Sequence, residues 1–315
     1  MSVYLFRFLC VLALVGLAHV PAFAQAPPTG PLVLHVPVSA RTAALANAWV
    51  AGRDQEVVFH NPAQLIGARP GFDLSLSRMG PASQMLSVGS VFAAGKWSLT
   101  FGWGAQVLGF NADAATSYPY SPDLLLTDGS RSGTSTLVTA GAAILVKKFR
   151  IGVAGKYVSD LGAASATSLL PLRANHQVVL LDVGVARNLF GGAAAVAFQN
   201  IGRHSRDNGS RLTVPRQVAV GWSTSKVAGP FDVGLYTQVT ARRDWTSPAA
   251  GVEVGYSWIE GVHVLLRAGA RRPETAAEKP LALGAAFTKD RLTVEYAARF
   301  FDAGRTAHGV TLRWR

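Results

Sequence analysis

Cysteine is almost absent from this sequence, which has Cys10 as its single example in 315 residues. Cys10 lies in an apolar run (8–20) that follows Arg7 and leads into small residues ending at Ala24, the pattern of a secretory signal peptide. We expect cleavage after Ala24, so that residues 1–24 are the signal peptide; a retained anchor is the alternative, but the run is short for a bilayer-spanning helix. The mature chain then lacks cysteine, which excludes disulfide bonds, thiol catalysis and cysteine-ligated metals.

Charged residues are also scarce, at 15% of the chain. The mature sequence holds no apolar run of about 18 residues, the length that a membrane helix needs, so its apolar residues must be spread over strands. The excess of Lys and Arg gives a formal net charge of +12, which in a soluble protein would suit a nucleic-acid partner. An exported protein does not meet nucleic acid, and we expect no such partner here.

Catalytic motifs are missing as well. The sequence has no Gly-x-Ser-x-Gly elbow, no His-Glu-x-x-His zinc motif and no Gly-x-x-x-x-Gly-Lys phosphate loop. Loop residues such as His204, Ser205 and Asp207 could assemble in space, but exposed polar loops produce such clusters by chance. We therefore predict a protein that is not an enzyme and that has no cofactor and no metal site.

What the sequence does contain, from about Phe72 onward, is a succession of segments in which bulky apolar residues alternate with small or polar ones. This period of two is the signature of a strand with two unlike faces. Segment 292–300 is a clear case, because Glu295 and Arg299 share one face. We predict fourteen strands, at 71–79, 84–93, 96–110, 134–147, 149–160, 176–187, 190–201, 214–224, 229–242, 248–258, 261–271, 280–288, 290–300 and 307–315. An even number returns the C-terminus to the side where the chain entered, as bacterial barrels require.

The connections between these strands alternate in length, as in a transmembrane barrel with short periplasmic turns and longer outer loops. The long ones are 111–133, 161–175, 202–213 and 272–279, and the tight ones lie at Ala94-Gly95, Lys148, Asn188-Leu189, Ile259-Glu260 and Lys289. The tight 80–83 turn is the one mismatch. Loop 111–133 could fold inward as a constriction, form an outer binding surface, or simply be solvated.

A soluble β-sandwich or propeller would also have alternating strands, but its polar faces should be rich in Lys, Glu and Thr. Here the second face is mostly Gly, Ala and Ser with isolated charges, which suits a narrow lumen. Aromatic residues lie towards segment ends, as interfacial girdles do. We therefore predict an all-β fold, a transmembrane antiparallel β-barrel of about 14 strands over residues 71–315, in the outer membrane of a Gram-negative bacterium.

Several charges share the inward parity of the C-terminal strands, since a charge facing lipid near the midplane would cost about 2–4 kcal/mol. These predicted luminal charges are Glu253, Arg267, Arg271, Glu295, Arg299 and Arg313. The interpretation we favour is a structural ion network that fills a small barrel, with a selectivity ring as the alternative.

Residues 25–70 do not alternate. The stretch 40–52 indicates a short helix or compact turn that stops at Gly52, and Asn61-Pro62 is a turn initiator, because proline disfavours the α conformation in the preceding residue. The stretch from Arg41 to Ala51, followed by Asn61-Pro62-Ala63-Gln64-Leu65 and about fourteen strands, resembles the PorV/PorQ-like branch of the FadL-type outer-membrane barrels.

Two departures from that pattern are Gln64, where the family usually has glycine, and Asn47, where glycine is common. The chain is also shorter than typical long-chain fatty-acid transporters of the family. The resemblance implies that residues 25–70 form a plug or hatch in the barrel mouth, with Asn61, Pro62, Ala63 and Leu65 as its motif.

The resemblance leaves two functions open: a plugged conduit for small hydrophobic compounds, or a non-conducting shuttle or scaffold of a secretion system. The small inner face with its charges ranks an ordinary water-filled porin below both. Expected partners are outer-membrane lipids, the barrel-assembly machinery that recognises the last strand (308–315), and hydrophobic small molecules or secreted proteins.

Overall fold

The structure is a computed structural model, and it describes residues 30–80, 83–94, 99–112, 131–164, 173–207, 210–243, 245–274 and 277–315. The predicted signal peptide and most of loop 111–133 lie outside these ranges. No helix in the described ranges has the length and apolar character needed to cross a membrane.

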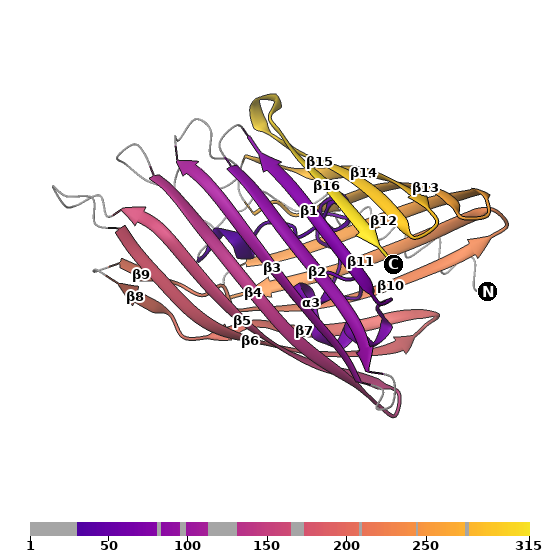
Figure 1. The fold of residues 1–315 in the computed structure, drawn as a ribbon, viewed down its shortest axis with the longest axis horizontal. Coiled ribbons are helices and arrows are strands. Elements are labelled where there is room, and N and C mark those ends of the chain that lie inside the picture. Colours follow the sequence, from indigo (N-terminus) through magenta and orange to yellow (C-terminus); the bar gives the residue numbers. More distant parts are fainter. Residues whose placement is uncertain are drawn as a thin grey trace.

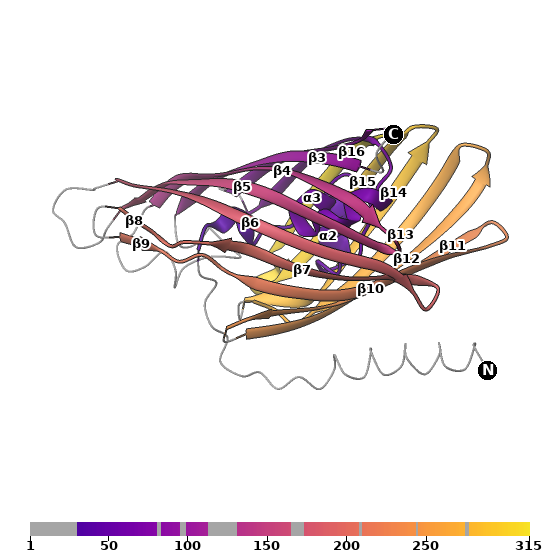
Figure 2. The same ribbon diagram turned by 90° about the horizontal axis from the view of Figure 1, so that it is seen from below.

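Fourteen antiparallel strands close into a barrel, in which the first strand pairs with the last (Figures 1 and 2). The strands are β1 (Gly71–Met79), β2 (Ser83–Ala94), β3 (Leu99–Ala112), β4 (Arg131–Val146), β5 (Phe149–Ala164), β6 (Arg173–Leu189), β7 (Gly192–Gly202), β10 (Gln217–Ala228), β11 (Phe231–Arg242), β12 (Trp245–Ile259), β13 (Val262–Arg271), β14 (Glu278–Lys289), β15 (Leu292–Phe301) and β16 (Thr306–Trp314). The predicted fold class and strand number are confirmed. The small hairpin of β8 (Ser205–Asp207) and β9 (Ser210–Leu212), which lies in the connection between β7 and β10, was not predicted from the alternation of residues.

The strands form because their alternating side chains divide between two environments. In β2, Met85 and Ser87 are buried inside the barrel while Leu86 between them is 50% exposed outside. The same outward exposure of Leu, Val, Phe, Tyr and Trp recurs around the barrel. An apolar outer belt of this kind is suited to lipid rather than water.

Tight two-residue connections gather at one end of the barrel, which we call the short-turn end. At Lys147, Phe190 and Asp290 the backbone has a positive φ, as the hairpin turns that match strand twist require. The C-terminal residue Arg315 follows β16 at this same end. The opposite end, which we call the loop end, carries the β7–β10 and β13–β14 connections. By the rule of short inner turns, the short-turn end would face the periplasm.

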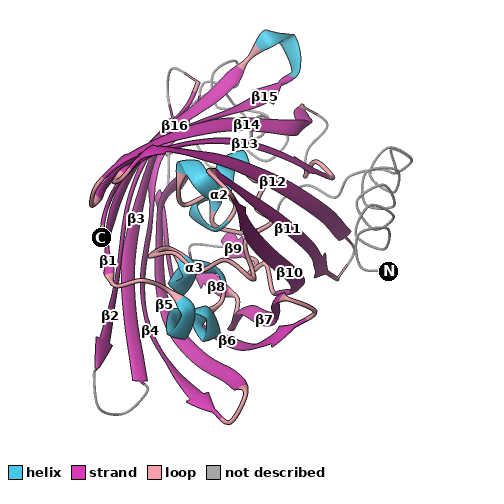
Figure 3. Cartoon of the chain, turned by 90° about the vertical axis from the view of Figure 1, so that its right-hand side faces the viewer, coloured by secondary structure: helices cyan, strands magenta, loops and turns pink. Residues whose placement is uncertain are grey.

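Residues 30–70, which we call the inner segment, lie within the ring of strands (Figure 3). They form η1 (Leu32–Leu34), α2 (Ala40–Ala44), α3 (Val57–His60) and η2 (Pro62–Gly67). Helix α2 packs against β13 to β16, and η2 packs against β3 to β6. The buried core of the molecule is therefore the interface between this segment and the inner wall of the barrel.

Glycine on the wall makes this interface possible. A Cβ added at Gly184 in β6 would collide with the side chain of Asn61, and one added at Gly269 in β13 would collide with the backbone of Leu45. The small residues of the inner face thus leave room for folded chain rather than for a water-filled pore.

The assignment of the outer face can be tested with Val138, which is 46% exposed near the middle of β4. Replacing it with arginine (Val138→Arg) is expected to lower the free energy of unfolding in phospholipid bilayers by about 2–4 kcal/mol, because the charge would face lipid. Denaturant titration measures this, with Val138→Leu as the matched control. Equal stability of the two variants would show that this face does not contact lipid.

Candidate functional site

The inner segment is joined to the barrel wall by buried ion pairs. Arg313 on β16 is 1% exposed and lies at the centre. Its guanidinium nitrogens are 2.8 Å from Glu56 Oε2, 3.1 Å from Asp54 Oδ2 and 2.8 Å from Glu295 Oε1. Asp54 and Glu56 come from the inner segment and Glu295 from β15, so one arginine bridges the two parts of the molecule.

The network continues through two further arginines. Arg267 on β13 lies 2.5 Å from Glu253 Oε2 and 3.1 Å from Glu295 Oε1. Arg41 on α2 lies 2.7 Å from Glu253 Oε1 and also pairs with Asp54. Burial opposes ionisation of Asp54, but the nearby guanidinium groups hold the pKa of this carboxyl well below its usual range. The network as a whole forms ion pairs between four arginines and four carboxylates. The arginines are Arg41, Arg267, Arg313 and Arg315, and the carboxylates are Asp54, Glu56, Glu253 and Glu295.

The other two predicted luminal arginines belong to a second cluster nearer the loop end. Arg271 Nη2 lies 2.8 Å from Glu278 Oε1, and Arg299 pairs with the same carboxylate. Glu278 begins β14, where sequence alternation placed no luminal charge. The structure therefore distributes the six predicted charges over two clusters.

The second cluster also reaches the inner segment. Glu274 in the β13–β14 connection lies 3.2 Å from Arg242 Nη1 and 3.0 Å from His35 Nδ1. The pKa of Glu274 is held far below its usual range, because Arg242 and His35 outweigh the effect of burial. Sequence alternation missed Glu274 because it lies in a loop, outside any strand pattern.

The predicted plug motif lies deep in the lumen. The Asn61 side chain accepts a hydrogen bond from the Ala63 amide at 3.1 Å, which starts η2 at Pro62. The same side chain donates to the Val50 carbonyl at 3.0 Å. Leu65 is fully buried and packs at Gly102 on β3. The motif thus forms a turn and also fixes an earlier part of the inner segment.

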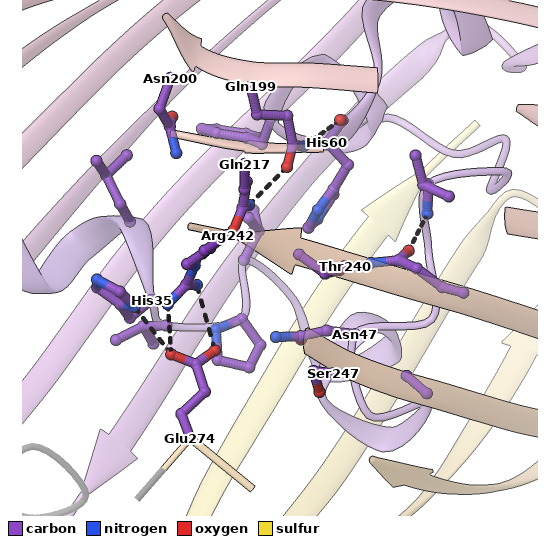
Figure 4. A pocket seen from close by; sticks show the side chains of 18 of the residues that line it. His35, Asn47, His60, Gln199, Asn200, Gln217, Thr240, Arg242, Ser247 and Glu274 are labelled. Atoms are coloured by element: carbon purple, nitrogen blue, oxygen red, sulfur yellow. Dashed lines mark hydrogen bonds and ion pairs between the residues drawn. The ribbon is translucent and has the colours of Figure 1, made fainter. Parts of the chain in front are cut away.

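A small cavity of about 80 Å³ opens on the loop-end side of the inner segment (Figure 4). One wall is a chain of polar side chains, in which Arg242 Nε donates to Gln217 Oε1 at 2.9 Å and Gln217 Nε2 donates to Gln199 Oε1 at 2.6 Å. Gln199 in turn donates to the His60 carbonyl, and Glu274 pairs with Arg242 at the other end of the chain. The side chains of Gln199 and Gln217 are therefore fixed by hydrogen bonds within this chain of polar groups.

Apolar side chains, most of them from the inner segment, also line part of this loop-end cavity. They include Val33, Val36, Val38, Val50, Phe59 and Leu137. His60 also lines the cavity, and burial together with the nearby Lys156 ammonium lowers the pKa of His60 to about 3. The imidazole is therefore neutral near pH 7. The cavity combines an apolar surface with polar groups whose positions are fixed.

A larger cavity of about 630 Å³ opens on the short-turn side. Residues 46–52, which we call the partition, lie between the two cavities: Asn47 and Val50 line the first, whereas Trp49, Ala51 and Gly52 line the second. Neutral hydrogen bonds hold the partition to the wall. Gln238 Oε1 accepts from the amides of Trp49 at 3.0 Å and Val50 at 2.7 Å, and Ser223 Oγ donates to the Ala51 carbonyl at 2.8 Å.

Two of the loop residues considered for catalysis, His204 and Ser205, make hydrogen bonds with residues outside the considered set. His204 Nδ1 accepts a hydrogen bond from the Val214 amide at 3.0 Å. Ser205 Oγ instead lies 3.3 Å from His176 Nδ1. The described ranges also contain no group of three or more His, Asp or Glu side chains that could hold a metal ion.

No family model and no curated protein matches this sequence. Solved structures do match its fold. A FadL homologue of Pseudomonas aeruginosa has a TM-score of 0.56 at 10% identity, over 91% of this chain and 98% of that chain. The CymD monoaromatic hydrocarbon channel has 0.61 at 9%, over 89% and 97%. The toluene transporter TbuX of Ralstonia pickettii has 0.55 at 13%, over 87% and 98%. The chain therefore has the fold of the FadL-type outer-membrane barrels.

Buried ion pairs of the network are expected to contribute much more to the free energy of unfolding than exposed ion pairs do. Arg313→Met would leave Asp54, Glu56 and Glu295 with an uncompensated charge, and it is expected to reduce the free energy of unfolding by about 3–5 kcal/mol. The matched change Lys279→Met breaks a pair with Asp302 whose side chains are 54% and 48% exposed, and it should cost less than about 1 kcal/mol. Denaturant unfolding measures both. Similar small losses would show that Arg313 does not tie the inner segment to the wall.

Proposed function

We propose that the protein is a conduit for small hydrophobic compounds in the outer membrane of a Gram-negative bacterium, closed by its inner segment acting as a plug. The observation that carries this proposal is the thinness of the partition. Val50 lines the loop-end cavity and its neighbour Trp49 lines the short-turn cavity. A compound passing through the barrel would therefore have one short stretch of chain to displace.

The way in which the partition is held supports the same function. Arg41 and Asp54, on either side of residues 46–52, are fixed by buried ion pairs. The contacts of the partition with Gln238, Ser223 and Asn61 are hydrogen bonds with a neutral side chain as one partner, which contribute about 0.5–1.5 kcal/mol each. These hydrogen bonds can break at lower cost than the ion pairs of the flanks, and movement of the partition would also take Trp49 and Val50 out of their buried packing.

The nature of the fold supports a hydrophobic cargo. Valine side chains and Phe59 line part of the loop-end cavity, and the ionic groups His35, Arg242 and Glu274 in its lining are paired with one another. The solved structures that share the fold include a monoaromatic hydrocarbon channel and a toluene transporter. Lipids of the outer membrane and the machinery that inserts barrels are the partners that follow from this placement.

The test is conductance in planar bilayers combined with binding of toluene as the hydrophobic probe. The wild-type protein is expected to bind toluene and to conduct few ions, because the inner segment fills the lumen. A variant lacking residues 25–70 should conduct ions freely. Gln238→Met, which removes both hydrogen bonds to the partition, should give frequent brief openings, while the control Val239→Ile on the outer face should behave as wild type.

Each other outcome has a defined meaning. High conductance of the wild type would contradict a plug and favour an aqueous porin. No toluene binding and no conductance in any variant would contradict a conduit. The PorV/PorQ-like alternative, a shuttle or scaffold for secreted proteins, would then become the hypothesis to pursue.

A further inference from the structure

Among the residues that the structure describes, one buried arginine inside the barrel has no counter-charge. The structure buries five arginine side chains in its described residues: Arg150, Arg267, Arg271, Arg299 and Arg313. All of them except Arg150 pair with glutamate or aspartate. Arg150 is 6% exposed and has no ion pair or hydrogen bond with any described residue, and its Nη2 is buried without a partner.

A second arginine lies beside it. A Cβ built on Gly67 would be 2.9 Å from Arg150 Nη1 and 3.2 Å from Arg53 Cδ, so the two side chains flank the same residue at the end of η2. The contact recorded for Arg53 is with a neutral group, a hydrogen bond from Nη2 to Asn188 Oδ1 at 3.0 Å. Two cations therefore lie close together with no carboxylate between them in the described part of the chain.

This arrangement is costly unless something else balances it. A guanidinium stays protonated in proteins, so Arg150 cannot relieve its burial by losing a proton. Repulsion from Arg53 adds to the cost of burial. The nearest acid along the chain, Asp54, already pairs with Arg41, Arg313 and Arg315. An anion supplied from outside the chain would satisfy the buried Arg150 and would also be attracted by Arg53, whose side chain is exposed.

There is space for such an anion and for the molecule that carries it. Arg53 and Gly67 line the 630 Å³ cavity on the short-turn side, together with the aromatic rings of Trp49 and Tyr236. Arg150 is not part of this lining, but its Nη1 lies beside Gly67. The Arg41 guanidinium lies 4.6 Å from the centre of the Trp49 ring, so the two side chains are stacked on each other. A ligand could place its charged group at the arginine pair and an apolar body in the cavity.

We propose that Arg150 and Arg53 form a binding site for an organic oxyanion, a carboxylate or phosphate group whose apolar body occupies the short-turn cavity. The planar guanidinium fork matches both groups, since each offers two or more oxygens for paired hydrogen bonds. The site goes beyond the proposed conduit function and does not depend on it. If the barrel does conduct, the site would bind organic acids at the short-turn end in preference to neutral compounds.

The test is isothermal titration calorimetry on the purified full chain in a non-ionic detergent and an anion-poor buffer. Benzoate and phenyl phosphate probe a soluble ligand, dihexanoylphosphatidylglycerol probes a lipid headgroup, and benzyl alcohol is the neutral control. At least one anion is expected to bind about tenfold or more tightly than benzyl alcohol. Arg150→Gln should weaken that binding by about tenfold or more, and Arg53→Gln should weaken it to a smaller degree.

The matched control is Arg187→Gln. Arg187 stacks on Phe149 at the same end of the barrel, on its outer face, so this variant loses the same charge outside the lumen and should bind as wild type. Binding of benzoate or phenyl phosphate with this dependence would identify a soluble acid as the ligand. The same dependence with phosphatidylglycerol alone would identify a lipid headgroup. No anion preference, or equal loss in Arg150→Gln and Arg187→Gln, would overturn the proposal.

Thermal unfolding gives a second readout that does not require tight binding. In the same anion-poor buffer Arg150→Gln is expected to unfold at a higher temperature than wild type, because it removes an unpaired buried charge. Added benzoate or phosphatidylglycerol should raise the unfolding temperature of wild type and leave that of the variant unchanged. A variant that unfolds at a lower temperature without added anion would show that Arg150 is already satisfied within the protein.

Discussion

The structure depends on the pairing of charge inside a closed wall. Arginines on the inner face of a barrel cannot turn to bulk water when the lumen is filled with chain, so each needs a carboxylate nearby. The wall supplies Glu253 and Glu295, and the inner segment supplies Asp54 and Glu56. Wall and inner segment are therefore complementary parts of one ionic core, and each has buried charges that are neutralised by charges of the other.

Steric fit and charge act together in placing the segment. Wall glycines such as Gly184 and Gly269 let its backbone approach closely, while ion pairs at Arg41 and Asp54 determine where it stops. Between these anchors the chain is held by hydrogen bonds to neutral side chains and by the packing of Trp49 and Val50. The flanks are therefore fixed by ionic contacts, whereas the partition is fixed by neutral ones.

The sequence predicted the barrel well because alternation is a local property. It placed Glu295 and Arg299 on one face, and the predicted strand 71–79 coincides with β1. It could not show which charges would meet, since the opposition of Glu253 to Arg267 depends on the register of β12 against β13. The roles of Asp54, Glu56 and Glu274 were missed because they lie outside alternating strands. The unpaired state of Arg150 is likewise visible only when every neighbour has been placed.

The most direct test of this account is amide hydrogen exchange of the inner segment in the intact protein. The amides of Ala43 and Asn61 are hydrogen-bonded to Ser39 and Val57 within the lumen. If the segment is part of the ionic core, these amides will exchange as slowly as those of the barrel strands. Exchange at the rate of an unstructured peptide would contradict the account, because it would mean that the segment is not held inside the barrel.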